Sequence, residues 1–123
     1  MRLLPLIFAL SLATPAAAFT AQNGLIVEPQ GADGFSVPWR GKSGPAAFWC
    51  AAGDYAIRVL HLAPTDVIYR ASEPPRRAGE PMDFTLNPEA SASTTGLFSL
   101  FQRGGGLSVG HAQSLCEFRQ KRR

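Results

Sequence analysis

The sequence predicts an α+β fold, in which one main helix packs on a small antiparallel sheet and one disulfide staples the domain. Three observations predict this fold. Residues 46–62 place apolar side chains at helical spacing, and several short runs of β-forming residues lie between Gly- and Pro-rich turns. The chain also has only two cysteines, which can form one disulfide. Because a helix with a wide apolar stripe needs a sheet to cover it, we expect the element order β-β-α-β-β-β-β.

The first residues have the three parts of a cleavable signal peptide. Arg2 supplies a positive charge, residues 3–12 are mostly apolar, and Ala16, Ala17 and Ala18 precede the expected cut. The apolar run is shorter than the roughly 20 residues that span a bilayer, so we favour cleavage after Ala18 over a retained anchor. No second hydrophobic segment follows, so no transmembrane segment is expected in the mature chain. The expected segments are a signal peptide at 1–18, a single domain at 19–118 and a basic tail at 119–123.

The positive charge of the chain is concentrated at its end. The formal net charge is +3, but four basic residues lie in the tail, and the rest of the mature chain has seven basic and nine acidic residues. Such a tail can contact phosphate groups, lipid headgroups or an acidic partner, although a solvated terminus is the favoured interpretation. No basic stripe with interleaved aromatic residues is present, so nucleic-acid binding is not expected.

Two short strands are expected before the helix. Residues 25–27 and 35–37 are apolar or β-forming and flank a turn at Gly31–Gly34. Pro38 follows the second run and limits that strand to edge pairing.

The main helix is the clearest element of the sequence. Ser43 is a good N-cap, Pro45 suits the first turn, and Pro64 ends the pattern. Gly53 is the one weak position inside it. The expected apolar stripe comprises Phe48, Ala52, Tyr55, Val59 and Leu62, widened by Trp49, Ala56 and Leu60.

Four further strands are expected after the helix. Residues 66–71 and 82–86 are rich in β-formers, and Met82, Phe84 and Leu86 alternate toward the core, with a long exposed loop at 72–81. Residues 96–102 and 107–111 are expected to form a hairpin around the glycines at 104–106. Residues 113–119 suit either a last helical turn or the end of that strand. The order of a helix followed by four strands is similar to that of cystatin-like folds, a likeness of topology that implies no function.

Cys50 and Cys116 are expected to pair. In an exported chain an even pair of cysteines indicates a disulfide. The bond would tie the helix to the last segment of the domain and, by the chain-entropy model, stabilise it by roughly 4 kcal/mol. A reactive thiol is disfavoured because there is no CxxC spacing and neither cysteine has an adjacent histidine.

One face of the helix carries Cys50, Asp54, Arg58 and His61. Asp54 and Arg58 have the favourable order for an i,i+4 ion pair, and His61 lies where a cation favours the helix C-terminus. We therefore treat Asp54, Arg58 and His61 as a candidate surface cluster. His61 cannot act as a base toward Cys50, because eleven residues of helix separate them by about 16 Å. His111 could approach only through the fold.

Other chemical motifs are weak. Gly41–Ser43 (GKS) lacks the earlier glycine of a P-loop, since that position is Ser36, and no buried parallel strand precedes it. No zinc-ligand spacing and no GxSxG or HExxH motif is present, so we expect neither a metal nor a cofactor. Trp39, Phe48 and Trp49 could line a pocket, but aromatic residues near a helix start are more often core.

These features favour a small, monomeric, non-enzymatic binding or scaffolding domain that contacts another envelope component. The signal peptide, the expected disulfide and the lack of a catalytic set motivate this hypothesis. The alternative is a small hydrolase or an enzyme inhibitor that acts through loop residues around Asp33, 72–81 or His111.

The run Phe48–Ala56 (FWCAAGDYA) resembles the helix of small uncharacterised exported proteins of Rhodobacter-like alphaproteobacteria. The late cysteine, Cys116, is the second feature of this resemblance. The resemblance covers about a tenth of the mature chain. It implies a periplasmic location, and it implies no activity, because such proteins have none assigned.

Overall fold

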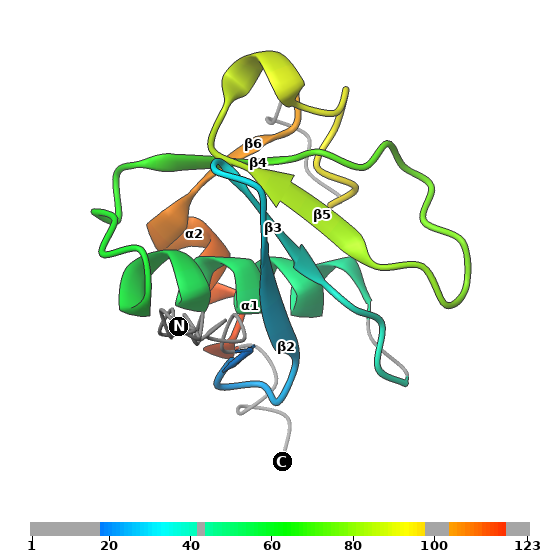
Figure 1. Cartoon of the computed structure of the whole chain (residues 1–123), viewed down its shortest axis with the longest axis horizontal. Helices are drawn as coiled ribbons and strands as arrows, with labels where there is room; N and C mark the ends of the chain where they lie inside the picture. Colours follow the sequence, from blue (N-terminus) through cyan, green and yellow to red (C-terminus); the bar gives the residue numbers. More distant parts are fainter. Residues whose placement is uncertain (1–17, 42–43, 98–103, 118–123) are drawn as a thin grey trace, which may run out of the picture.

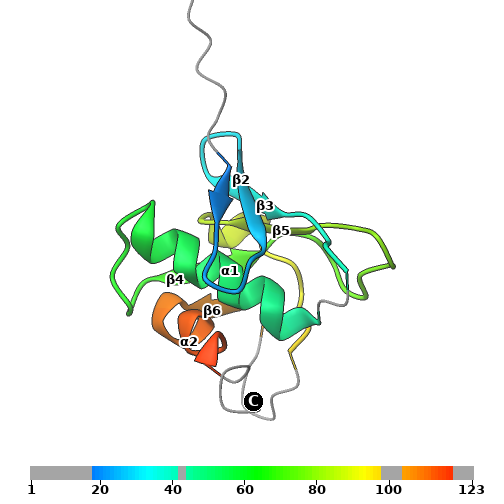
Figure 2. The same ribbon diagram turned by 90° about the horizontal axis from the view of Figure 1, so that it is seen from below.

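The computed structural model describes residues 18–41, 44–97 and 104–117. These residues form the expected α+β domain, with one main helix, α1 (Pro45–Arg58), lying across one face of an antiparallel sheet (Figure 1). A short second helix, α2 (Val109–Ser114), packs alongside α1, as a view from below also shows (Figure 2). The predicted fold class is therefore confirmed.

The sheet has six strands in the order β1-β2-β3-β5-β4-β6, and all neighbours are antiparallel. A 3₁₀ helix, η1 (Pro88–Ala90), follows β5. The strands are β1 (Phe19–Thr20), β2 (Ile26–Gln30), β3 (Gly34–Val37), β4 (Val67–Arg70), β5 (Met82–Thr85) and β6 (Gly106–Ser108).

The strand order contains a crossover. Phe84 of β5 lies opposite Phe35 of β3 on one side and Arg70 of β4 on the other, so β5 separates the two strands that α1 connects. Since both pairings are antiparallel, β3 and β4 run parallel, and β3-α1-β4 is a split β-α-β unit. The long loop 72–81 then returns the chain so that β5 fills the gap.

Residues 107–111 were expected to form a hairpin with 96–102, but they form the end of β6 and the start of α2. β6 ends at Ser108 and pairs with β4, with Leu107 opposite Ile68. The chain turns helical after Ser108 because the Ser108 side chain accepts a hydrogen bond from the His111 N–H and caps α2. Gly96 and Leu97 are not in a strand, and residues 98–103 lie outside the described part.

The ends of α1 differ from the expectation. Gly44 is the N-cap, whereas the predicted cap, Ser43, lies outside the described residues. The helix ends at Arg58 rather than continuing to residue 62, so Val59 is 41% exposed and is not part of the buried stripe.

The middle of α1 is buried on all sides, from Phe48 to Ala56. The sheet covers one face, with Trp49 meeting Phe84 edge-on at 4.9 Å between ring centroids. Helix α2 covers another face and approaches so closely that a Cβ at Gly53 would lie 2.5 Å from the backbone nitrogen of Gln113. Phe48, Ala52 and Tyr55 of the expected stripe are therefore buried, and the polar residue Asp54 is buried with them.

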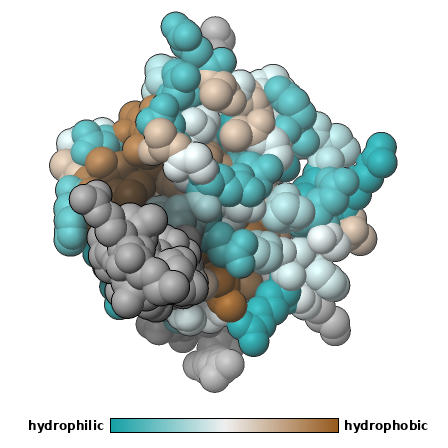
Figure 3. All heavy atoms as spheres, viewed as in Figure 1, coloured by the Kyte–Doolittle hydropathy of each residue, from teal (hydrophilic) through white to brown (hydrophobic). Residues whose placement is uncertain are grey.

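The long loop after β4 projects from the right of the domain in Figure 1. The same part of the surface is hydrophilic in Figure 3, which shows hydrophobic residues gathered mainly in a hollow at the left. The loop at 72–81 is thus largely exposed, as the sequence predicts.

Candidate functional site

The two cysteines form the predicted disulfide. Cys50 lies on the second turn of α1, and Cys116 follows α2. Both residues are buried, with 1% and 8% of their surface exposed. The bond joins segments 66 residues apart, and it leaves neither thiol available as a nucleophile.

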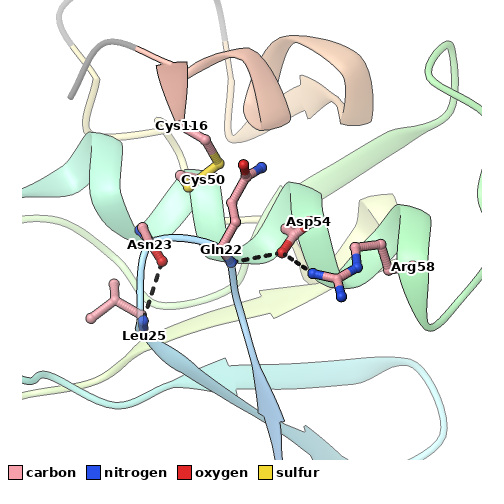
Figure 4. A network of polar contacts seen from close by, with 7 residues as sticks. All are labelled: Gln22, Asn23, Leu25, Cys50, Asp54, Arg58 and Cys116. Carbon is pink, nitrogen blue, oxygen red and sulfur yellow. Dashed lines mark hydrogen bonds and ion pairs between the residues drawn. A yellow bond between two sulfur atoms is a disulfide. The ribbon is translucent and has the colours of Figure 1, made fainter. Parts of the chain in front are cut away.

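Asp54 is a buried carboxylate rather than a surface residue. One of its oxygens accepts hydrogen bonds from the Gln22 backbone N–H at 2.9 Å and from Arg58 Nη1 at 3.1 Å (Figure 4). The predicted ion pair with Arg58 is confirmed, but it joins a side chain that is 2% exposed to one that is 55% exposed. The turn between β1 and β2 covers Asp54, which the helix pattern alone could not indicate.

His61 does not join this network. Because α1 ends at Arg58, His61 lies beyond the helix with a left-handed backbone (φ 56°), and the Leu62 N–H donates to the Ala56 carbonyl at 2.9 Å. The predicted cluster of Asp54, Arg58 and His61 is therefore reduced to its first two members.

Arg70 is a buried cation that our sequence analysis did not identify. It is 1% exposed, because it lies two residues after Ile68 in β4 and both side chains therefore point to the same, buried face of the strand. Its Nη1 donates to the Thr95 carbonyl at 3.3 Å, and the same oxygen accepts a hydrogen bond from Trp49 Nε1 at 3.0 Å. Its Nε and Nη2 have no hydrogen-bond partner in the part of the chain that is described. The sequence signal that could have identified this residue is an arginine two residues after Ile68 in an expected strand, on the same face as that apolar side chain.

The charge of Arg70 is disfavoured by its surroundings. Burial lowers the pKa of Arg70, the nearby charge of Arg76 lowers it further, and that of Glu73 raises it. Glu73 accepts hydrogen bonds from both the side chain and the backbone N–H of Ser93, at 2.7 and 2.8 Å, and these bonds lower the pKa of Glu73.

Trp39 is the exposed aromatic residue of the predicted trio. Phe48 and Trp49 are fully buried in the core, whereas Trp39 is 43% exposed. Trp39 lines an open hollow of about 260 Å³ together with Pro38, Arg40, Ile26 and Glu28.

The loops of the enzyme or inhibitor hypothesis do not converge. Asp33 lies in the β2–β3 turn and borders a hollow of about 180 Å³ with apolar lining from Tyr55, Leu60 and Leu86. The turn, the loop 72–81 and helix α2, which carries His111, lie on different sides of the domain in both ribbon views (Figures 1 and 2). The three groups therefore do not form one site.

The described ranges contain no group of three or more His, Cys, Asp or Glu residues that could hold a metal ion. In the same ranges, no helix combines the length and the apolar character needed to cross a bilayer.

No protein-family model matches the chain, and neither the curated proteins nor the solved structures include a significant match.

Proposed function

We propose that the mature chain is an exported periplasmic domain that binds or scaffolds another envelope component without catalysing a reaction. The signal-peptide pattern and the disulfide support export, because disulfides persist in oxidising compartments. The resemblance of the Phe48–Ala56 helix to small exported alphaproteobacterial proteins supports the periplasm as the destination.

Phe19 supports a cut after Ala18. It is the first residue of β1 and lies opposite Val27. Its ring packs 5.8 Å from that of Tyr55, and the Arg58 guanidinium lies 5.1 Å from its centroid. A cut further along the chain would remove these contacts, whereas a cut after Ala18 keeps all of them.

The observation that carries the binding role is the exposed Trp39. Tryptophan and arginine are enriched at protein interfaces, where a few large side chains supply most of the binding free energy. Trp39 combines nearly half of its surface in solvent with an adjoining hollow, and a charged residue of each sign, Glu28 and Arg40, borders that hollow. This is the composition expected of an apolar anchor with a polar rim.

The binding role is tested by capture from the periplasm. A tagged chain with its own signal peptide, at native expression, should retain one envelope protein, and Trp39→Ala should weaken that association by at least about tenfold. Val67→Ala is the matched control, because Val67 is an apolar residue of β4 that is 42% exposed, much like Trp39. A monomer without a partner, or equal losses in the two variants, would contradict the proposal.

Export is tested separately by mass spectrometry of the periplasmic fraction. The expected species begins at Phe19 and takes up thiol-alkylating reagent only after reduction. Retention of residues 1–18, or alkylation without reduction, would contradict it.

A further inference from the structure

We propose that Arg70 is the centre of a binding site for a small oxyanion, a carboxylate or a phosphate, which pairs with its Nε and Nη2 atoms. We call these two atoms the Arg70 fork. This inference does not rest on the proposed function, since it requires neither export nor a protein partner.

The fork is buried but has no acceptor. Arg70 has 1% of its surface exposed, and its hydrogen bond to the Thr95 carbonyl uses Nη1 alone. Nε and Nη2 have no partner among the described residues. A buried charged group is costly unless it is paired and hydrogen-bonded, so the two donors require an acceptor.

The geometry of the fork selects the kind of acceptor. Nε and Nη2 lie on the same edge of the planar guanidinium, and their N–H groups point in parallel. Two parallel donors match the two oxygens of a carboxylate or a phosphate, which arginine binds in a bidentate manner.

The surrounding residues hold the guanidinium in place. The Thr95 carbonyl that accepts from Arg70 also accepts from the Trp49 indole, which is itself fully buried. Gly96 has a left-handed backbone (φ +78°), and a Cβ at this position would collide with Nη1 of Arg70. The absence of a side chain at Gly96 therefore leaves room for the Arg70 guanidinium, and the hydrogen bond from Nη1 fixes its orientation. The Nε and Nη2 edge of the guanidinium is left without an acceptor among the described residues.

The local charge favours an anion. Arg76 lies close enough for its charge to oppose that of Arg70, and its guanidinium stacks 4.7 Å from the ring centroid of Phe48, on the second turn of α1.

The nearby carboxylate is already engaged. Glu73 accepts two hydrogen bonds from Ser93 rather than from Arg70, and it is exposed while Arg70 is buried. An external oxyanion therefore satisfies the fork without breaking the contacts of Glu73.

The test titrates the disulfide-bonded protein with potassium phosphate and with sodium acetate, with chloride at matched ionic strength as the control. We expect a saturable rise of several degrees in Tm with at least one oxyanion and none with chloride, because a ligand that binds only the folded state stabilises it. Phosphate and acetate, compared at equal concentration, identify which oxyanion binds more tightly.

Two variants assign the effect to the fork. Arg70→Gln should abolish the oxyanion-dependent rise, whereas Arg77→Gln, which removes the same charge from an exposed position of the 72–81 loop, should retain it. Arg70→Lys keeps the charge without the fork and should weaken the oxyanion at least about tenfold. Equal losses in the Arg70→Gln and Arg77→Gln variants would indicate non-specific screening and overturn the proposal.

A measurement on the unmodified protein remains decisive if the Arg70 variants fail to fold. The ¹⁵N-detected Nε–H resonance of Arg70 should shift on addition of the oxyanion, with the same midpoint as the change in Tm. No shift of that resonance with up to 100-fold more oxyanion than protein would show that no external oxyanion occupies the fork. A shift on Glu73→Gln that is larger than the shift caused by the oxyanion would show that Glu73, and not an external oxyanion, is the acceptor of the fork.

Discussion

At the scale of the residue, buried charge is the main feature of this domain. Asp54 and Arg70 are each 1% exposed, but they differ in how they are satisfied. The Asp54 carboxylate accepts one backbone and one side-chain hydrogen bond. Arg70 has one acceptor and two unused donors. Asp54 therefore has a structural role, whereas Arg70 is a candidate for binding.

Removal of the Asp54 carboxylate should destabilise the domain more than removal of its exposed partner. Asp54→Ala leaves the Gln22 N–H without its acceptor, and we expect the free energy of unfolding to fall by about 2 kcal/mol. Arg58→Ala removes a half-exposed partner and should cost less than about 1 kcal/mol beyond lost packing on Phe19. Urea unfolding of both variants measures the difference, and an equal or reversed order would contradict the assigned role.

Glu73 should make stability depend on pH in the acid range. Hydrogen bonds from Ser93 hold the folded pKa of Glu73 below its ordinary value of 4.5. The contribution of ionised Glu73 to the stability of the folded protein is therefore complete above pH 4.5, and it is lost as the pH falls through the lower pKa of the folded state. We expect the decline of Tm between about pH 5 and pH 3 to be shallower in Glu73→Gln and in Ser93→Ala than in the unmodified chain. Parallel curves for the three proteins would contradict this.

At the scale of the element, the contact between α1 and α2 decides what the main helix can tolerate. A Cβ at Gly53 would lie 2.5 Å from Gln113 N and 2.9 Å from the Ala112 Cβ. Gly53 therefore allows α2 to approach, although in the isolated helix it is only a weak position.

Gly53→Ala should destabilise the protein in spite of its favourable helix propensity. Alanine is better than glycine in a helix interior by about 1 kcal/mol, but overpacking against the α2 backbone costs about 1–3 kcal/mol. We expect a net loss of up to about 2 kcal/mol in the free energy of unfolding, measured by denaturant titration with the disulfide intact. A more stable variant would show that α2 is not held tightly against α1.

At the scale of the whole molecule, the disulfide joins the main helix to the end of the described chain. It closes more than half of the chain, since Cys50 and Cys116 are 66 residues apart. It also fixes α2 on the face of α1 that the sheet does not cover.

Loss of the disulfide should lower stability by about 2–5 kcal/mol. The reduced protein and a Cys50→Ala/Cys116→Ala double variant should show similar losses in denaturant titrations. The double variant should be insensitive to reductant, which serves as the control. A loss below about 1 kcal/mol in both proteins would show that packing alone holds α2.

The sequence was informative wherever the relevant signal is local. The period of apolar residues predicted the helix, the alternation at 82–86 predicted β5, and the i,i+4 spacing predicted the Asp54–Arg58 pair. The chain has only two cysteines, so only one disulfide pairing, Cys50 with Cys116, was possible within it. The point at which α1 ends was missed because the left-handed turn at His61 has no strong local signal.

The sequence was uninformative where a distant segment decides the outcome. The position of β5 between β3 and β4 depends on how the long loop returns. The burial of Asp54 depends on the β1–β2 turn, which lies about thirty residues earlier in the chain. The Arg70 fork depends on Thr95, which no expected element included, and on Gly96, which was expected to begin a strand.

The sequence by itself therefore determined the fold class, the main helix and the pairing of the cysteines, because periodicity and composition are properties of neighbouring residues. Tertiary structure decided the strand order, the burial of Asp54 and the unused edge of Arg70. These features depend on which surfaces meet, and burial and hydrogen-bond partners are properties of the packed molecule rather than of any one segment.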